Sequence, residues 1–358
     1  MLSRPKPRRH IKSENEVCRR TTLRQTSFNA LKLAGAIPGE SYMADKVLIY
    51  SRFPKAMMKR IGDRFDLIDA AGKKPAEAFS ADELRDVRAL ITAGGQALKG
   101  DVMDMLPQLG AIICYGTGYD GVDFKAAAER KILVGNSPGA NAASVADLAL
   151  TLMLAVTRRI LPADQYLREG GWSQAKPSPL MSPQPGNPGR KVGVYGMGEI
   201  GRKIAARVAA FETEVAYYSR SKHDVPYRHI ESLEALVEWC DVLMVAVRAG
   251  PDTQHIINAD MLKKLGPNGY VINISRGSVI DEAALVTALT DKTIAGAGLD
   301  VFETEPHAPG ALTTLLNVVL TPHVGGHTLD SHVSMQDCVI ANLTAYFADK
   351  PLPYPVAS

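Results

Sequence analysis

The stretch from Lys191 to Ala210, KVGVYGMGEIGRKIAARVAA, decides the fold of the chain. A short apolar run ends in Gly196-x-Gly198-x-x-Gly201, and a helical pattern follows at once. In a strand–turn–helix unit, one such glycine permits the tight turn, one lets a pyrophosphate approach the backbone, and one lets helix and strand pack closely. The stretch therefore predicts a βαβ unit that binds a dinucleotide at the start of its helix.

Short apolar runs alternate with helical stretches on both sides of this unit. Strands are expected at 46–50, 65–70, 89–94, 111–116, 132–136, 191–196, 214–219, 242–247, 269–275, 295–300 and 317–323. Helices are expected at 55–64, 81–87, 100–106, 144–160 and 331–347, and a Pro-rich loop at 176–190. The pattern predicts an α/β protein with two open, doubly wound parallel-sheet domains and a cleft between them.

The length of 358 residues suits two domains, with 46% hydrophobic and 22% charged residues. We expect a substrate domain from 43–141 plus 325–358 and a cofactor domain from 142–324. No apolar run approaches the ~20 residues that a membrane span needs, so no membrane partner is expected. The four cysteines are scattered and form no CxxC pair, which favours a reducing, cytoplasmic location. They are Cys18, Cys114, Cys240 and Cys338.

The basic charge of the chain lies in its first 42 residues. They hold nine Lys or Arg and three Glu, a net charge of +6, whereas the rest carries −3. Three interpretations are open: a disordered extension, non-native sequence before a true start at Met43, or a targeting or nucleic-acid-binding arm. The polar, aperiodic composition favours disorder, and we expect no nucleic-acid partner.

The end of the strand after the glycine loop selects the dinucleotide. An NAD enzyme carries Asp or Glu there, which accepts a hydrogen bond from the ribose 2′-OH. This chain has Ser219-Arg220-Ser221 instead. A guanidinium suits a 2′-phosphate, so NADP(H) is the expected cofactor, although Asp224 leaves NAD(H) as an alternative.

Three ionisable residues follow apolar strands of the second half. Arg276 follows YVINIS, Glu305 lies in DVFETEP, and His323 follows VVLTP. The carboxyl ends of parallel strands gather ligands, so these side chains are expected to converge. His323 can protonate a carbonyl oxygen, Glu305 can orient and stabilise its imidazolium, and Arg276 can bind a carboxylate and polarise a carbonyl. The set predicts the reduction of a 2-keto acid.

His323, His327 and His332 also suggest a metal site, since HxxxH on a helix can bind zinc. Gly325-Gly326 between the first two disfavours a regular helix there, and no thiolate or carboxylate has matching spacing. We predict no metal.

From about Lys46 to Val356 the chain resembles the D-isomer-specific 2-hydroxyacid dehydrogenase family. Within the family it is most similar to the NADPH-dependent glyoxylate/hydroxypyruvate and hydroxyphenylpyruvate reductases. The resemblance rests on PQLGAIICYGTGYDGVD, VADLALTLMLAVTRRI, REGGW, GMGEIGRKIA, NISRGSVIDEAAL, AGAGLDVFETEP and LTPHVGG, in the family's order. It implies a flavodoxin-like substrate domain beside a Rossmann cofactor domain.

The resemblance also assigns roles to residues. Arg276, Glu305 and His323 match the catalytic set, and the turn Thr117-Gly118 matches a loop that holds the substrate carboxylate. The residues that match the cofactor site are Gly196, Gly198, Glu199, Ile200, Gly201, Ser219, Arg220, Ser221 and Asp300. Trp172 lies in a segment that reaches towards a partner subunit in related reductases, so a homodimer is expected.

The family likeness predicts reduction of glyoxylate, hydroxypyruvate or an arylpyruvate to the D-2-hydroxy acid. Two departures from the family pattern stand out: Ser219-Arg220 in place of an acid, and VAVRAGPDT in place of a proline-containing loop. Arg248 in the latter is either a cofactor contact or a surface residue. Two other functions stay open, a same-fold dehydrogenase acting on phosphite or formate, and a non-catalytic nucleotide sensor similar to dehydrogenase-like corepressors.

Overall fold

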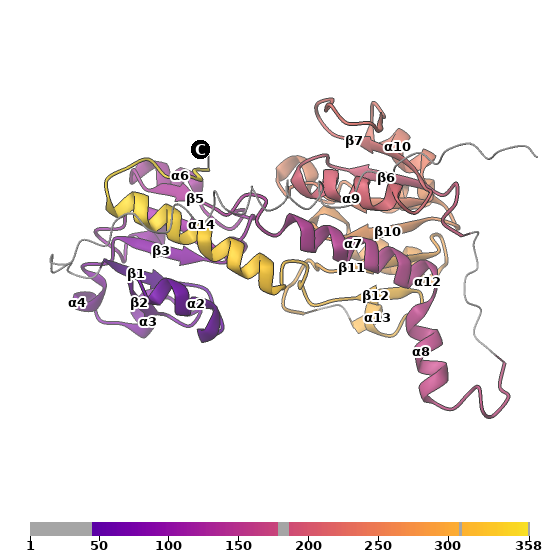
Figure 1. Cartoon of the computed structure of the whole chain (residues 1–358), viewed down its shortest axis with the longest axis horizontal. Coiled ribbons are helices and arrows are strands. Elements are labelled where there is room, and N and C mark those ends of the chain that lie inside the picture. The colour runs from indigo at the N-terminus through magenta and orange to yellow at the C-terminus, as the bar shows by residue number, and fades with distance from the viewer. Residues whose placement is uncertain (1–44, 178–185, 308–309, 357–358) are drawn as a thin grey trace, which may run out of the picture. The chain divides into compact units, whose positions relative to one another are not determined.

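The structure is a computed structural model, and it describes residues 45–177, 186–307 and 310–356 (Figure 1). The predicted basic tail, residues 1–42, lies outside the described residues, as do residues 178–185 of the predicted Pro-rich loop. Among the described helices, none combines the length and the apolar character that crossing a membrane would require.

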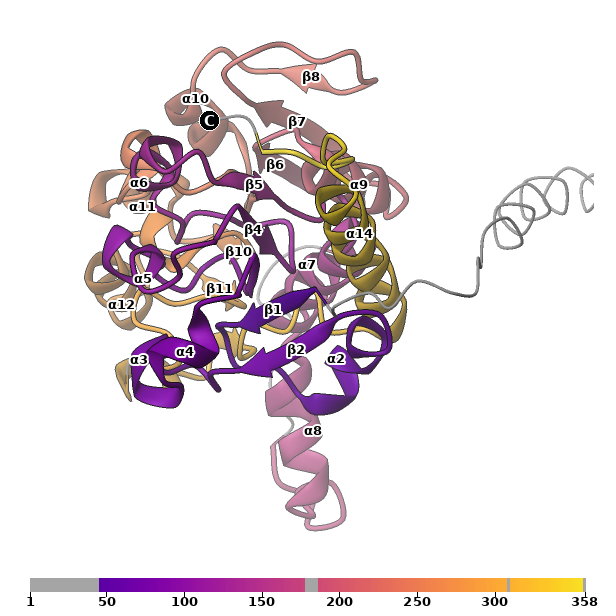
Figure 2. The same cartoon turned by 90° about the vertical axis from the view of Figure 1, so that its left-hand side faces the viewer.

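The first half of the chain forms a five-stranded parallel sheet in the order β2-β1-β3-β4-β5. Its strands are β1 (Lys46–Ile49), β2 (Asp66–Asp69), β3 (Ala89–Thr92), β4 (Ala111–Cys114) and β5 (Leu133–Gly135). Its helices are α2 (Lys55–Gly62), α3 (Pro75–Ala78), α4 (Ala81–Leu84), α5 (Gly100–Met103), α6 (Phe124–Glu129) and the C-terminal α14 (Leu329–Phe347). Helices α2 and α14 pack together on one face (Figure 2). The strand order is that of flavodoxin-like sheets.

The second half forms a seven-stranded parallel sheet in the order β12-β11-β10-β9-β6-β7-β8. Its strands are β6 (Lys191–Tyr195), β7 (Glu214–Tyr218), β8 (Arg228–His229), β9 (Val242–Val245), β10 (Tyr270–Asn273), β11 (Gly296–Leu299) and β12 (Val318–Leu320). Its helices are α7 (Ala142–Thr157), α8 (Ile160–Arg168), α9 (Glu199–Ala209), α10 (Leu233–Trp239), α11 (Ala259–Leu265), α12 (Glu282–Thr290) and α13 (Gly310–Thr313), with 3₁₀ turns η2 (Pro251–Thr253) and η3 (Gly277–Val279).

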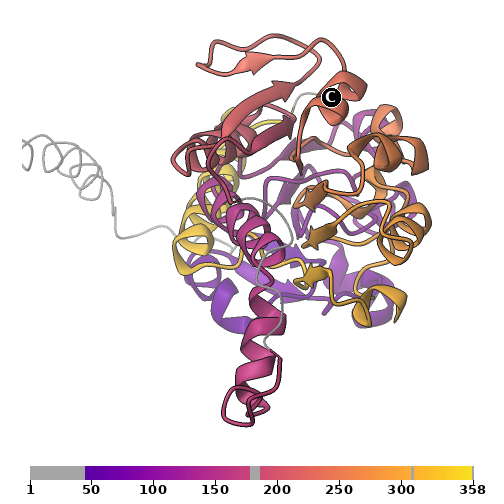
Figure 3. The same ribbon diagram turned by 90° about the vertical axis from the view of Figure 1, so that its right-hand side faces the viewer.

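Both faces of the second sheet are covered, which explains its apolar strands. One buried cluster joins the sheet to α7 and α9, and another joins it to α10, α11 and α12 (Figure 3). If the seven strands are renumbered 1 to 7 from β6, the sheet reads 3-2-1-4-5-6-7 from its β8 edge. This is the Rossmann order 3-2-1-4-5-6 with one further strand. The predicted fold class, two doubly wound parallel sheets, is confirmed.

The predicted helix at 144–160 starts two residues earlier and ends three residues earlier than expected, and the helix that follows it was not predicted. Helix α7 runs from Ala142 to Thr157, and α8 starts anew at Ile160. Arg159 between them adopts a left-handed φ of 49°, which no regular helix continues. Pro162 is the sequence feature that indicates a new helix, because proline is tolerated in the first turn of a helix and not in its interior. Helix α8 has no buried residue and projects from the sheet in Figures 1 and 3.

Other differences are smaller. Helices α4 and α5 end at Leu84 and Met103, each three residues before the predicted end. Besides α8, the α-helices and strands for which no prediction was made are α3, α6, α10, α11, α12, α13 and the two-residue strand β8. The final helix starts at Leu329 rather than Ser331, because the Thr328 hydroxyl accepts a hydrogen bond from the Ser331 N–H and caps it.

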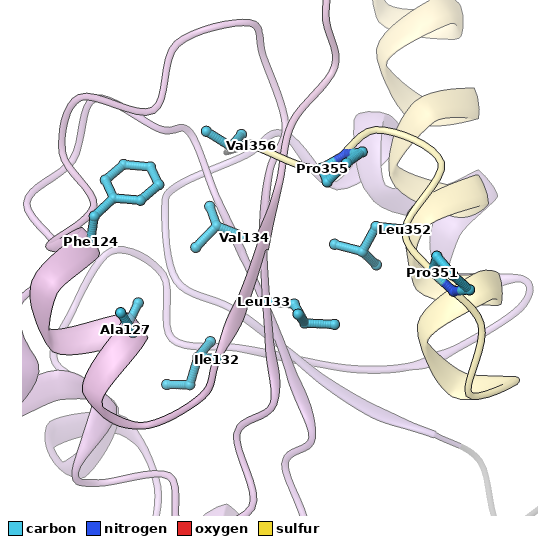
Figure 4. A pocket seen from close by; sticks show the side chains of 10 residues that line it. Phe124, Ala127, Ile132, Leu133, Val134, Pro351, Leu352, Pro355 and Val356 are labelled. Atoms are coloured by element: carbon cyan, nitrogen blue, oxygen red, sulfur yellow. The ribbon is translucent and has the colours of Figure 1, made fainter. Parts of the chain in front are cut away.

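The last described residues run along the outer edge of β5. Gly135 forms an antiparallel bridge with Pro355, and the Val356 N–H donates to the Val134 carbonyl at 2.8 Å. We call residues 351–356 the C-terminal strap. A cavity of about 310 Å³ lies between this strap, β5 and α6 (Figure 4). It is lined by Phe124, Ala127, Ala128, Ile132, Leu133, Val134, Pro351, Leu352, Pro355 and Val356, and none of the predicted site residues is among them.

Candidate active site

The three glycines in the turn after β6 and the first turn of α9 have three different surroundings. Gly196 has a φ of +99°, and a Cβ there would lie 2.7 Å from the Ala246 carbonyl oxygen. A Cβ on Gly201 would lie 1.9 Å from the Gly196 oxygen, so helix and turn touch there. A Cβ on Gly198 would meet no heavy atom within 4 Å. Gly198 therefore leaves open space in front of the helix.

Helix α9 begins at Glu199 without a side-chain cap, so its first N–H groups and its positive end face that open space. Glu199 is exposed and Ile200 is half-buried in this first turn. The open space and the uncapped N–H groups are what a pyrophosphate site needs, and contact of these residues with the cofactor stays a prediction.

The loop after β7 carries the predicted selector of the dinucleotide. The Ser219 hydroxyl donates to the Ser221 carbonyl at 2.6 Å, which tightens the turn and leaves Arg220 exposed. No acid follows β7 directly, and Asp224 lies further along on the exposed side of the loop.

His323 and Glu305 come together from the ends of two neighbouring strands. His323 follows β12 with a left-handed φ of 51°, and its Nδ1 lies 2.7 Å from Glu305 Oε2. Burial alone would raise the pKa of the Glu305 carboxyl. The hydrogen bond and charge of His323, the Phe302 N–H and the Arg276 charge outweigh burial, so this pKa is lowered.

Asp300 holds the loop that presents His323. Its carboxylate accepts from the Thr321 hydroxyl at 2.6 Å and from the N–H groups of Val324 and Gly325 at 2.8 and 2.9 Å. Its carbonyl accepts from the His323 N–H at 2.8 Å. Asp300 is 2% exposed, so its first role in this structure is to position the histidine. Its predicted contact with the cofactor stays a prediction.

Arg276 follows β10 and reaches the loop after β4. Its Nη2 donates to Asp120 Oδ1 at 2.8 Å, its Nε donates to the same carboxylate, and its Nη1 donates to the Ser275 carbonyl at 2.7 Å. A Cβ on Gly118 would lie 2.0 Å from Arg276 Nη2, so only glycine permits this approach. The guanidinium therefore lies against the predicted carboxylate-binding turn.

The Thr117 hydroxyl is turned towards the chain segment that leads into α7. It donates to Asn141 Oδ1 at 2.8 Å and lies 3.2 Å from the Ser137 carbonyl oxygen. Its side chain thus anchors the turn, and the backbone of Thr117 and Gly118 is what the turn can offer to a ligand.

Two residues of this loop were not singled out from the sequence. Tyr119 lies under Arg248, whose Cζ is 4.4 Å from the ring centroid, and Asp120 pairs with Arg276. Arg248, which follows β9 in the second half of the chain, thus packs on Tyr119, which follows β4 in the first half. The sequence feature that could have identified Asp120 is an acidic residue within the motif GTGYDGVD.

The other histidines do not join His323. The rings of His327 and His332 lie 5.6 Å apart, and burial together with His327 lowers the pKa of His332. Within the described parts of the chain, no three His, Cys, Asp or Glu side chains are grouped so that they could hold a metal ion.

Residues 150–325 match the family model "D-isomer specific 2-hydroxyacid dehydrogenase, NAD binding domain". The 2-ketogluconate reductase of Gluconobacter oxydans is 42% identical over 276 residues, which cover 75% of this chain and 86% of that protein. The hydroxyphenylpyruvate reductase of Plectranthus scutellarioides is 38% identical over 313 residues, or 87% and 98% of the two chains. The chain belongs to the D-isomer specific 2-hydroxyacid dehydrogenase family.

A solved structure supports the same assignment for this dehydrogenase. The NADPH-dependent glyoxylate/hydroxypyruvate reductase of Sinorhizobium meliloti, in complex with NADP and malonate, superposes with a TM-score of 0.82 at 38% identity. The match covers 88% of this dehydrogenase and 97% of that chain. The predicted family is thereby confirmed, and the protein is an NAD(P)-dependent oxidoreductase of that family.

Proposed function

We propose that this dehydrogenase reduces small 2-keto acids to D-2-hydroxy acids and prefers NADPH. Glyoxylate and hydroxypyruvate are the first expected substrates, and arylpyruvates are the bulkier ones. The observation that carries the proposal is the 2.7 Å contact of His323 with Glu305, beside an arginine whose charge acts on the same carboxylate. In this proposal residues 142–324 bind the cofactor, and residues 43–141 with 325–358 complete the substrate site.

His323 is the proposed proton donor. Its Nδ1 faces Glu305, which leaves Nε2 as the nitrogen that can donate to a ligand. The reduced nicotinamide, when bound, supplies a hydride to the carbonyl carbon, and the carbonyl oxygen then takes the proton from Nε2. Glu305 stabilises the imidazolium before transfer and fixes the ring orientation.

Arg276 is the proposed substrate-binding cation. Asp120 and Ser275 occupy three of its five N–H groups, so one N–H on each terminal nitrogen is available to a keto acid. The adjacent backbone of Thr117 and Gly118 supports binding of the substrate carboxylate, and the guanidinium can polarise the carbonyl oxygen.

The preference for NADPH rests on the loop after β7. Arg220 is exposed there, and no carboxylate directly follows the strand to repel a 2′-phosphate. The relative from Sinorhizobium meliloti is described as NADPH-dependent, which agrees with this preference.

A homodimer is also part of the proposal. Four large apolar side chains on or after α8 are exposed by about half or more: Ile160 47%, Leu161 51%, Leu167 55% and Trp172 75%. Such a cluster is costly in water, which supports burial against a second subunit. Light scattering of the purified protein would measure the mass.

The test is a set of initial rates with NADPH and with NADH. The substrates are glyoxylate, hydroxypyruvate, phenylpyruvate, hydroxyphenylpyruvate and 2-ketogluconate, the last because of the relative from Gluconobacter oxydans. We expect turnover with NADPH and a loss of about 100-fold or more in kcat for His323→Ala, the range of general acid catalysis. Absence of turnover with every acid, in a protein that still binds NADPH, would overturn the proposal and favour phosphite-type chemistry or a nucleotide-sensing role.

A further inference from the structure

The loop Ser219–His223 is closed on itself by one tyrosine. The Tyr217 hydroxyl accepts from the His223 N–H at 2.8 Å and donates to the His223 carbonyl at 3.1 Å. Tyr217 is fully buried, so surrounding side chains hold its hydroxyl in one position. His223 is therefore held by its backbone at a defined place after β7.

Arg202 in the first turn of α9 reaches the same histidine. Its Nη2 lies 3.0 Å from His223 Nδ1, and both side chains are partly buried. A guanidinium has only donors, so His223 Nδ1 must be the acceptor. The ring proton of neutral His223 is consequently on Nε2, which is left to donate to a ligand.

These side chains lie at the place where a Rossmann fold binds the adenosine ribose. The ribose lies between the glycine loop and the end of the next strand, here the start of α9 and the end of β7. Arg202 projects from the former element, and Arg220, Lys222 and His223 follow the latter. Arg202 and His223 are in contact there, and Arg220 and Lys222 are exposed in the same loop as His223.

We propose that Arg202 and His223 are specificity-determining residues that bind the 2′-phosphate of the cofactor together with Arg220. Arg202 fixes the tautomer of His223, and the Nε2–H of His223 donates to a phosphate oxygen. Arg202 adds positive charge from the helix side, while Arg220 adds it from the strand side. The inference rests on the proposed preference for NADPH.

The test uses two halves of the cofactor and needs no turnover. Binding of 2′,5′-ADP and of 5′-AMP to the full-length protein is measured by calorimetry, for wild type and for His223→Asn, His223→Gln and Arg202→Ala. Asn places an acceptor near Nδ1 but has no donor near Nε2, whereas Gln places an amide donor near Nε2. Arg228→Ala, which removes an exposed cation on β8, is the matched control for general electrostatics.

We expect His223→Asn and Arg202→Ala to weaken 2′,5′-ADP binding roughly tenfold, the loss of one charge-assisted hydrogen bond. Binding of 5′-AMP should stay within about twofold, since 5′-AMP has no 2′-phosphate to lose a bond. His223→Gln should retain most of the affinity, and Arg228→Ala all of it. Equal losses for both ligands, or no loss for either, would overturn the inference.

The thermal midpoint of each variant separates a folding defect from a binding defect. If Arg202→Ala fails to fold, Arg202→Lys takes its place, because lysine keeps the charge without the planar donor and should lose part of the affinity for 2′,5′-ADP alone. Equal binding of both ligands by wild type would refute the preference for NADPH together with this inference. It would leave 2-keto acid reduction with NADH standing.

Discussion

Asp120 and Arg276 form an ion pair that joins the loop after β4 to the loop after β10, with Nη2 and Oδ1 2.8 Å apart. Asp120 accepts along the edge of the guanidinium that carries Nε and Nη2. The side chains of Asp120 and Arg276 are 29% and 27% exposed, respectively. The pair therefore fixes the plane of the guanidinium before any keto acid binds.

Replacement of Asp120 by alanine is expected to impair the use of the keto acid. Without its partner the guanidinium can rotate away from Gly118, and kcat/KM for hydroxypyruvate should fall at least about tenfold, as small misplacements do. The Kd for NADPH should stay unchanged. Asp120→Asn, which keeps an acceptor without the charge, should fall between wild type and alanine. An unchanged or higher kcat/KM for Asp120→Ala would show that Asp120 competes with the substrate instead.

The pH dependence of stability should show the effect of the lowered pKa of the Glu305 carboxyl. Its pKa is lowered on folding, so its ionised form stabilises the native state above the ordinary carboxyl pKa of about 4.3, and this contribution is lost as pH falls through the lowered value. Glu305→Gln should therefore be less stable than wild type near pH 6, and the difference should close towards pH 3. Thermal midpoints across this range measure the difference.

Glu282→Gln is the control with the opposite sign. Burial and, to a smaller extent, the charge of Glu303 raise the pKa of Glu282 and outweigh the hydrogen bond from the Glu303 N–H, so the ionised carboxyl destabilises the native state at neutral pH. This variant should gain stability relative to wild type near pH 7 and lose that advantage as pH falls. Parallel behaviour of the two variants would contradict the opposite shifts.

Two glycines of the cofactor loop should respond differently to one added methyl group. Gly198→Ala meets open space, so the protein should fold normally but bind NADPH about tenfold or more weakly, because the methyl takes room at the pyrophosphate site. Gly201→Ala would collide with the Gly196 carbonyl and should lose about 1–3 kcal/mol of stability or more. Chemical denaturation and fluorescence titration of NADPH separate the two. Equal stability of both variants would be inconsistent with the close contact at Gly201.

The buried thiols should be unreactive in the native protein. Burial raises the pKa of Cys114 and of Cys240 to about 12, so neither forms much thiolate at pH 8. In a Cys18→Ser background, a thiol reagent at pH 8 should label neither residue until denaturant is added. Mass mapping identifies the labelled site, and rapid labelling of Cys114 or Cys240 in the native state would show that the fold opens there.

The sequence predicts most of the scaffold because its signals are local. The glycine spacing and the apolar strands locate the dinucleotide loop, and the positions after three strands locate Arg276, Glu305 and His323. The contact between Glu305 and His323 joins loops after two neighbouring strands, and the parallel topology makes their convergence an expectation.

Other features depend on contacts that a local pattern does not contain. The ion pair of Asp120 with Arg276 joins residues 156 positions apart, and nothing in either segment specifies the partner. The end of α7 depends on one left-handed residue, Arg159, inside a run whose composition is helical throughout. The position of His223 beside Arg202 likewise depends on the Tyr217 hydroxyl, which bonds across the loop.

The strap that pairs with β5 also protects the sheet from self-association. β5 is an edge strand, and an uncovered edge is a template on which strands of other molecules can pair. Pro355 and Val356 occupy that edge, and Pro351, Pro353 and Pro355 cannot extend a hydrogen-bonded ladder outwards because proline lacks an N–H. Shortening the chain before Pro351 would expose the β5 edge together with the apolar lining of its cavity, so aggregation is the foreseeable result of such a truncation.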